Sequence, residues 1–150
     1  MEVTFTSSLE AEQRQELLAL FEISFGKALR NDSMLTSMEA VCMVTHPDHG
    51  LCGAALLEKT ACGIYLSKFA VAPAMRGDGI AKLMWEHLCA SYPAFFWRAH
   101  RENPFSAWYM RRSEDWCEQG EWCVFWHGLT QDKAEVATEY AVHRPIDFVS

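Results

Sequence analysis

The stretch VAPAMRGDGIAKLMWEHL, residues 71–88, begins with the pattern of a strand and ends with the pattern of a helix. Between the two halves lie Arg76, Gly77, Asp78 and Gly79. Glycine lets another molecule approach the backbone closely, and the free N–H groups in the first turn of a helix attract anions. Arg76 adds a positive charge at the same corner. The stretch therefore predicts a phosphate-binding turn, with a plain strand-to-helix turn as the alternative.

Working outward from this corner, the spacing of apolar residues predicts a sheet covered by helices, of the α/β or α+β class. Strands are expected at 2–6, 41–45, 51–57, 64–72, 94–99 and 121–127, of which the second to fourth form an antiparallel meander. Five helices are expected. The first follows a capping box of Ser7 and Glu10, and a short second one runs from Lys27 towards Met38. The others lie at 78–88, after Asn103 as N-cap, and at 130–142.

The length and composition predict a single domain over residues 1–150. The formal net charge of −7 argues against nucleic acid or an anionic membrane as the main partner. The N-terminus lacks the pattern of a signal peptide, and no apolar run approaches the ~20 residues that span a bilayer, so a cytoplasmic location is expected.

The six cysteines and the histidines do not suggest a metal site. No C-x-x-C occurs, so the cysteines are expected to be reduced, small apolar residues. His46 and His49 lie in HPDHG, which has the chemistry of a polar hairpin turn. No metal is expected.

The glycine loop matches one kind of phosphate site better than two others. The pattern G-x-x-x-x-G-K-[ST] is absent, and the third glycine of a Rossmann fingerprint is missing. RGDGIA, residues 76–81, fits R-x-x-G-x-[GA] and resembles the acetyl-CoA pyrophosphate loop of the GNAT acetyltransferase superfamily. That resemblance implies a mixed, mostly antiparallel central sheet flanked by helices. It also implies that acetyl-CoA contacts Phe69, Ala70, Val71, Arg76, Gly77, Asp78, Gly79, Ile80 and Ala81.

Four further blocks narrow the resemblance. YLSKFAV (65–71), FFWRAHRENPFSAWYMRRS (95–113), WCVFWHGL (122–129) and SFGKALRND (24–32) resemble the acetyltransferase domain of N-acetylglutamate synthases. Larger members of that family carry an amino-acid-kinase-like domain ahead of this one. The chain is therefore expected to be a stand-alone short form, and association with an amino-acid kinase or a homodimer is left open.

The resemblance implies that the amino-acid substrate is held by Lys27, Tyr65, Lys68, Arg98 and Asn103. The chemistry suits glutamate, whose two carboxylates need fixed cations or amide donors. All of these residues except Arg98 also have a structural alternative. The two lysines can be solvated surface residues, the asparagine can be a helix N-cap, and the tyrosine can simply pack.

Tyr109 is the candidate general acid. Amine attack on a thioester expels a thiolate, and a phenol is a suitable proton donor to it. A packed aromatic residue beside Trp108 is the alternative. In the superfamily, a backbone N–H in the strand at 69–71 polarises the thioester carbonyl, as an oxyanion hole does.

Two departures from the family pattern leave the acceptor open. Ser67 stands where relatives read aspartate in Y-L-D-K-F, and His100 stands where they often read the second arginine of W-R-S-R. His100 can still donate to a carboxylate, and Arg101 is a second substitute.

The sequence therefore indicates transfer of an acetyl group from acetyl-CoA to the α-amine of L-glutamate, the first step of arginine biosynthesis, by direct amine attack. One alternative is an acetyltransferase for a different amino acid or small amine. The other is a non-catalytic, CoA-binding regulatory partner of an amino-acid kinase.

Overall fold

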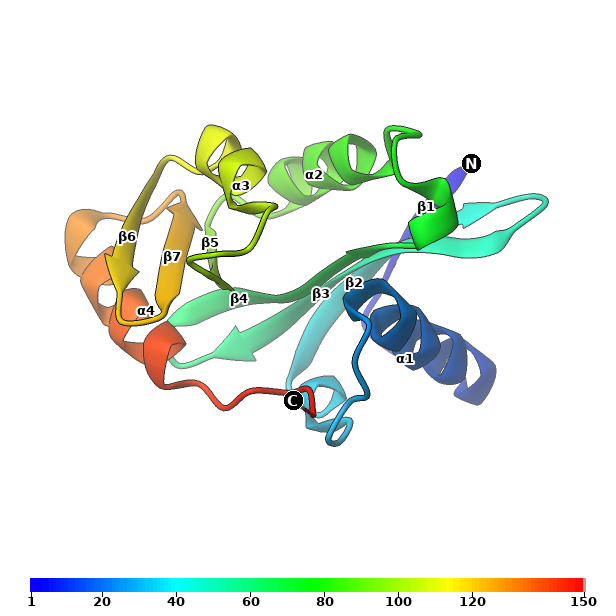
Figure 1. Cartoon of the computed structure of the whole chain (residues 1–150), viewed down its shortest axis with the longest axis horizontal. Helices are drawn as coiled ribbons and strands as arrows, with labels where there is room; N and C mark the ends of the chain where they lie inside the picture. The colour runs from blue at the N-terminus through cyan, green and yellow to red at the C-terminus, as the bar shows by residue number, and fades with distance from the viewer. Residues whose placement is uncertain (150) are drawn as a thin grey trace. The chain divides into compact units, whose positions relative to one another are not determined.

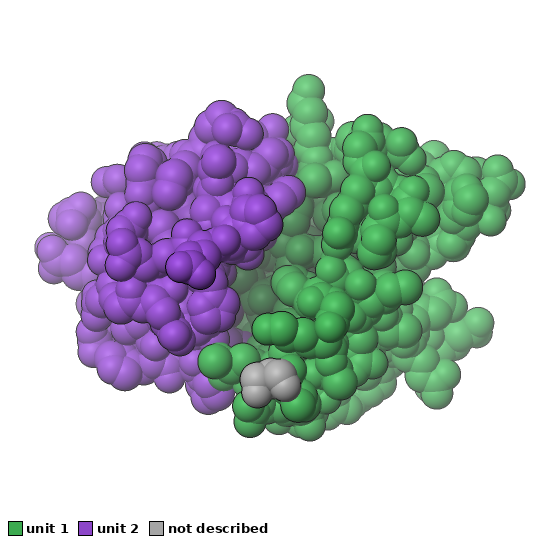
Figure 2. All heavy atoms as spheres, viewed as in Figure 1, with its two compact units in different colours: residues 1–59, 66–91, 146–150 green, residues 60–65, 92–145 purple. Residues whose placement is uncertain are grey.

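The computed structural model describes residues 1–149, which fall into two compact units (Figure 2). Unit 1 contains Met1–Lys59, Leu66–Ser91 and the described residues from Ile146 on. Unit 2 contains Thr60–Tyr65 and Tyr92–Pro145. Within the described residues, no helix is long and apolar enough to cross a membrane.

The strands form a mixed sheet (Figure 1). They are β1 (Glu2–Thr6), β2 (Met38–His46), β3 (Gly50–Thr60), β4 (Gly63–Val71), β5 (Phe95–His100), β6 (Asp115–Gln119) and β7 (Trp122–His127). Their order is β1-β2-β3-β4-β5-β7-β6. The β1–β2, β2–β3, β5–β7 and β6–β7 pairs are antiparallel, whereas β4 and β5 pair in parallel. The predicted fold class is confirmed.

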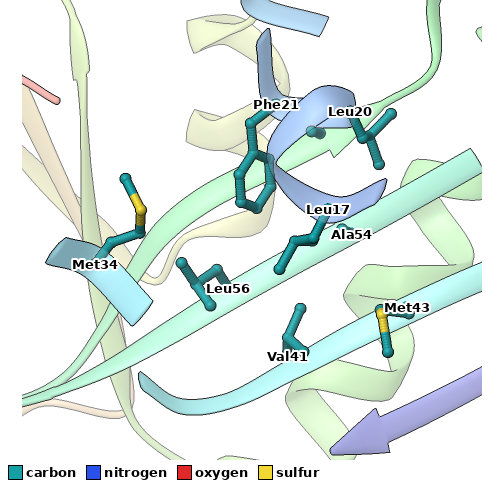
Figure 3. Packing of buried hydrophobic residues seen from close by; sticks show 9 residues of the cluster. Leu17, Leu20, Phe21, Met34, Val41, Met43, Ala54 and Leu56 are labelled. Carbon is teal, nitrogen blue, oxygen red and sulfur yellow. The ribbon is translucent and has the colours of Figure 1, made fainter. Parts of the chain in front are cut away.

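In unit 1, helix α1 (Ala11–Phe25) covers one face of β2 and β3. Leu17 and Phe21 are fully buried and point from α1 toward Val41 and Leu56 on the strands (Figure 3). The two helix residues lie four positions apart, as one face of a helix requires. This core fixes the C-terminal end of α1 against the sheet.

Helix α2 (Ile80–Ser91) lies on the opposite face of the same strands (Figure 1). A Cβ added to Gly53 in β3 would lie 2.6 Å from Ile80 Cγ2 and 3.2 Å from Met84 Sδ. Only glycine leaves room for this approach without a shift of those side chains. The first residue of α2 is thereby held directly on the sheet.

In unit 2, successive residues of β5 and β7 point alternately to the two faces of the sheet, because side chains alternate along a strand. Phe96 and Val124 pack with Ala137 of helix α4 (Gln131–His143). Trp97 and Phe125, from the opposite positions, contact Tyr109 of helix α3 (Ser106–Arg112). Both helices of unit 2 are therefore positioned by the same two strands.

The structure corrects the expected start of α1 and the helix expected from Lys27 to Met38. The capping box is made by Glu10 and Gln13, one turn later than the predicted pair of Ser7 and Glu10. The second helix does not form; only a short 3-10 turn, η1 (Ser33–Leu35), occurs in that region. Asn31 Oδ1 accepts a hydrogen bond from the Ser33 N–H at 2.9 Å, a local bond that competes with helix formation.

Strand β6 was not predicted. Its sequence, DWCEQ, is mostly polar, because β6 is the last strand of the sheet order and pairs with β7 alone. Gly120, with φ +62°, makes the turn between the two strands. The hairpin matters because β7 begins with Trp122, whose ring contacts Arg98.

Candidate active site

The corner at Arg76–Gly79 is an exposed turn in unit 1. A short 3-10 turn, η2 (Pro73–Met75), leads from β4 into the loop. Gly77 and Gly79 have φ values of +95° and +80°, and a Cβ added to either would meet nothing within 4 Å. The Leu83 N–H donates to the Gly79 carbonyl at 3.1 Å, so α2 starts directly after this glycine. Its first-turn N–H groups have no acceptor within the helix and face an exposed corner, which suits an anion.

Arg76 is tied to the end of α1. Its Nη2 donates to the Ser24 carbonyl at 2.8 Å, and the Ser24 hydroxyl donates to the Val71 carbonyl at 3.2 Å. Ser24 thus connects the loop with the last residue of β4. Ser24 begins the SFGKALRND block, but no role was predicted for it, because its bonds to Arg76 and Val71 depend on how α1 packs on the sheet.

The three residues of β4 expected along the CoA arm alternate in burial. Ala70 is buried in the core under α1, while Phe69 and Val71 are half-buried. The Phe69 ring meets Trp85 of α2 edge-on, with centroids 6.0 Å apart.

Lys68 is buried in unit 1, with 5 % of its surface exposed, so the solvated alternative is wrong for it. Its ammonium lies 2.5 Å from Asp147 Oδ2 and 3.1 Å from Ser67 Oγ. Lys27 is exposed, which is compatible with the alternative of a solvated surface lysine. It directly precedes Ala28, whose carbonyl accepts a hydrogen bond from the Val149 N–H.

Arg98 lies in unit 2 and holds the C-terminal end of α4. Its Nη1 donates to the Ala141 and Arg144 carbonyls at 2.7 and 2.6 Å, and its Nη2 donates to the Pro145 carbonyl at 3.0 Å. The guanidinium also lies over the Trp122 ring. Carbonyls at a helix C-terminus lack intrahelical donors, so an arginine there satisfies them.

The two expected substitutes for the missing family arginine have partners on the hairpin of β6 and β7. His100 stacks on Trp122, with ring centroids 4.2 Å apart. Arg101 forms an exposed ion pair with Glu118 at 2.7 Å. Trp122 therefore touches both Arg98 and His100, and these contacts were not predicted because the hairpin around Trp122 was only half predicted.

Asn103 bonds to the backbone, though not as the N-cap of α3. Its Oδ1 accepts from the Phe105 N–H at 2.8 Å, and its carbonyl accepts from the Ser106 N–H at 3.0 Å. The helix begins at Ser106 with Phe105 as N-cap, two residues later than expected. The side-chain NH₂ group is not used in either bond.

Tyr109 and Tyr65 are both buried in unit 2, at 9 % and 3 % exposure. The Tyr109 ring packs against Trp97 and Phe125 at 5.7 and 5.4 Å. Burial, and secondarily the charge that Tyr65 would carry, raises the pKa of the Tyr109 phenol well above its usual value. Its hydroxyl therefore keeps its proton throughout the neutral range. Tyr65 packs on Phe96 at 5.1 Å.

Comparison with known proteins identifies the family. Residues 3–143 match the family model described as NAT, N-acetyltransferase, of N-acetylglutamate synthase. The chain belongs to this N-acetyltransferase family. It is 32 % identical to the mitochondrial N-acetylglutamate synthase of Danio rerio over 148 residues, which are 96 % of this chain and 28 % of the relative. It is 33 % identical to an acetylglutamate kinase of Xanthomonas campestris over 121 residues, 75 % of this chain and 27 % of the relative. The chain thus spans about a quarter of the length of these relatives.

Solved acetyltransferases confirm the GNAT fold of this N-acetyltransferase family member. A GNAT family acetyltransferase from Listeria monocytogenes superposes with a TM-score of 0.63 at 13 % identity, covering 85 % of this chain and 95 % of the other. The PaiA N-acetyltransferase from Thermoplasma acidophilum, solved in complex with coenzyme A, gives 0.61 at 14 % identity, covering 85 % and 99 %.

Proposed function

We propose that this chain is an acetyl-CoA-dependent N-acetyltransferase that acts on the α-amine of an amino acid, with L-glutamate as the acceptor, and that residues 1–150 form one catalytic domain. The observation that carries the proposal is the corner at Arg76–Ala81. It is an exposed turn with two left-handed glycines at the start of α2, in a chain whose residues 3–143 match an N-acetyltransferase family.

The pyrophosphate of acetyl-CoA binds at this corner. The N–H groups of Gly77 and of Gly79 to Ala81 donate to its oxygens, while the Asp78 N–H donates to the Met75 carbonyl, and the exposed Arg76 guanidinium supplies positive charge. The thioester arm runs along residues 69–71 of β4, where a backbone N–H donates to the thioester carbonyl oxygen and stabilises negative charge as it develops. The coenzyme A complex of the Thermoplasma acetyltransferase, which has the same fold, supports this assignment.

Transfer takes place in one covalent step between the two bound substrates. The neutral amine attacks the thioester carbonyl carbon, the C–N bond forms, the C–S bond breaks, and the amine loses one proton to water. The sulfur leaves as a thiolate and takes the hydroxyl proton of Tyr109, which is then reprotonated from solvent. Because burial makes this phenol a weaker acid than a thiol of pKa about 8.5, a hydrogen bond donated to the departing sulfur precedes complete transfer.

The acceptor is held by Lys27, Tyr65, Lys68, Arg98 and Asn103. Two observations bear on its identity. The family named for N-acetylglutamate synthase supports glutamate, whereas the pairing of Lys68 with Asp147 favours an acceptor with less negative charge. A different amino acid or small amine is therefore the second candidate. The acetylglutamate kinase relative supports association with such a kinase as a further role.

Steady-state release of CoA tests the proposal. Purified protein is incubated with acetyl-CoA and each of L-glutamate, L-glutamine, L-aspartate and L-lysine, and the products are identified by mass spectrometry. We expect saturable release of CoA with glutamate and formation of the N-acetyl product. Tight CoA binding without turnover on any amine would instead support the non-catalytic regulatory partner.

A further inference from the structure

The segment Ile146–Val149 lies alongside residues 28–30 of unit 1 like an added strand. The Arg30 N–H donates to the Asp147 carbonyl and the Val149 N–H donates to the Ala28 carbonyl, each at 2.8 Å. These two bonds flank an antiparallel bridge between Leu29 and Phe148. The SFGKALRND block that the family resemblance connects with substrate is therefore in contact with this segment.

The same segment places a carboxylate on a buried lysine. Asp147 Oδ2 lies 2.5 Å from Lys68 Nζ, and the two side chains are only 15 % and 5 % exposed. The Phe148 ring lies 5.5 Å from the ammonium and 4.8 Å from the Phe25 ring, and so limits access of water. A carboxylate on an ammonium in such a shielded place makes the same interaction that a carboxylate of an acidic amino acid would make there.

We propose that Asp147 occupies the position of an acceptor carboxylate on Lys68 and is thereby a specificity-determining residue. This inference rests on the proposed function, because it takes Lys68 as part of the acceptor site. An acidic acceptor binds at Lys68 only when the 146–149 segment has left. The apparent dissociation constant of the acceptor is then its intrinsic constant divided by the fraction of molecules in which the segment is displaced.

Single substitutions can remove contacts that hold the segment. Besides the ion pair, its polar bonds include the two backbone bonds and one bond from Arg30 Nε to the Phe148 carbonyl at 3.0 Å. Ile146 and Val149 are 47 % and 49 % exposed and contribute little burial, whereas Phe148 packs against the core of unit 1. Segments with few buried apolar contacts open at a lower free energy than the core. Removal of the ion pair or of the Arg30 bond therefore shifts the segment toward the displaced state.

Calorimetric titration with L-glutamate tests the competition directly. We expect Asp147→Asn to bind L-glutamate about tenfold or more tightly than the wild type, the gain that follows when a state populated at ten per cent or less becomes dominant. L-Glutamine, which lacks the side-chain carboxylate, should gain little. Lys68→Met in the Asp147→Asn background should abolish the gain. Equal glutamate affinity of the wild type and Asp147→Asn, or no binding to either, would overturn the inference.

A second variant loosens the segment and leaves both charges in place. Arg30→Ala removes the bond to the Phe148 carbonyl, and we expect glutamate affinity to rise by several-fold. Arg14→Ala is the matched control, because Arg14 forms an ion pair with Asp32 in the same unit and takes no part in the bonds to 146–149 described above. If both alanine variants change glutamate affinity equally, the segment does not compete with the acceptor.

Two readouts separate this inference from the proposed function. In the wild type, L-glutamate should speed hydrogen exchange of the Arg30 and Val149 amides, because it displaces the segment. If the wild type acetylates amino acids while Asp147→Asn leaves glutamate affinity unchanged, acetyl transfer stands and the role of Asp147 falls. If Asp147→Asn binds glutamate more tightly but no form releases CoA, the pairing on Lys68 stands and acetyl transfer falls.

Discussion

The guanidinium of Arg98 lies over the ring of Trp122, with its central carbon 3.8 Å from the ring centroid. Strand β5 supplies the arginine and β7 supplies the tryptophan, in an antiparallel pair. Its Nη1 and Nη2 donate to three carbonyls at the end of α4. One side chain therefore fixes where α4 ends.

Arg98→Lys should lower the free energy of unfolding by about 2–3 kcal/mol. Lysine keeps the charge but has no planar fork to stack and donate to several carbonyls at once, and each lost bond from a charged group is worth about 1.5–3 kcal/mol. Arg101→Lys is the control, because its ion pair with Glu118 is about half exposed and such pairs contribute about 0–1 kcal/mol. Urea unfolding measures both, and equal losses would contradict the assignment. A raised KM for the acceptor in folded Arg98→Lys would add support for its proposed contact with substrate.

Tyr109→Phe should lower kcat by about 10²- to 10⁴-fold with little change in KM, the range typical of a lost general acid. The ring that packs on Trp97 and Phe125 remains, so the fold should hold. Single-turnover rates with enzyme in excess over acetyl-CoA avoid masking by slow product release. Tyr140→Phe is the matched control; it loses a hydroxyl that accepts from Arg144 at 3.0 Å, and kcat should stay unchanged. A wild-type single-turnover rate in Tyr109→Phe would leave this residue as a packed aromatic only.

Gly79→Val should abolish CoA binding while the protein stays folded. A β-branched side chain is disfavoured at φ +80° and would stand where the pyrophosphate approaches the backbone. Gly50→Val carries the same strain, since Gly50 has φ +71° in the β2–β3 turn and equally open surroundings. Both variants should lose roughly 1–2 kcal/mol of stability, but only Gly79→Val should lose CoA in isothermal titration. Unchanged CoA affinity in the folded Gly79→Val protein would remove the loop assignment.

Gly128→Ala should destabilise the protein by more than about 3 kcal/mol, at the upper end of single substitutions. The added Cβ would lie 1.9 Å from the Pro93 carbonyl oxygen, which belongs to backbone and cannot swing away. Gly120→Ala shares the positive φ but meets nothing within 4 Å, so it should cost only the backbone strain of about 1 kcal/mol. Thermal unfolding compares the two, and similar Tm losses would show that the chain relaxes around residue 128.

Stability should fall as pH rises from about 8.5, the unperturbed value for a thiol, toward about 11. Burial raises the pKa of the Cys42 and Cys123 thiols to about 11 in the folded chain. Between the two values the unfolded chain has released these protons and the folded chain has not, so each step up in pH favours unfolding. Urea unfolding at a series of pH values, with Cys42→Ala as the comparison, should show a shallower loss in the variant. The same slope in both would contradict the assignment to Cys42.

The elements with a strong local signal were predictable. The meander of β2 to β4, the strand-loop-helix corner and the long helices α2 and α4 follow from apolar spacing and glycine placement. Boundaries shifted by one to a few residues, as at α3, because Asn103 bonds to the Phe105 N–H and not to the first turn of the helix. Strand β6 was missed because its polar residues carry no alternating apolar pattern.

The partners of the expected site residues were less predictable than their positions. Lys68 and Arg98 are where the pattern placed them, but their charges meet Asp147 and the carbonyls at the end of α4. Those contacts join residues far apart in the chain, and no local rule connects them. The same holds for Ser24 and Arg76, whose hydrogen bond depends on how α1 packs on the sheet.

Gly53 touches no predicted ligand, yet it governs how closely Ile80 can lie on β3. In a deep mutational scan scored on coenzyme binding, position 53 should therefore group with the glycines of the loop and not with the other positions of its own strand. A library that varies only side-chain bulk at this site would shift the loop without altering its chemistry. Substitutions at this core position would then change the affinity for the coenzyme in steps, although residue 53 does not contact it.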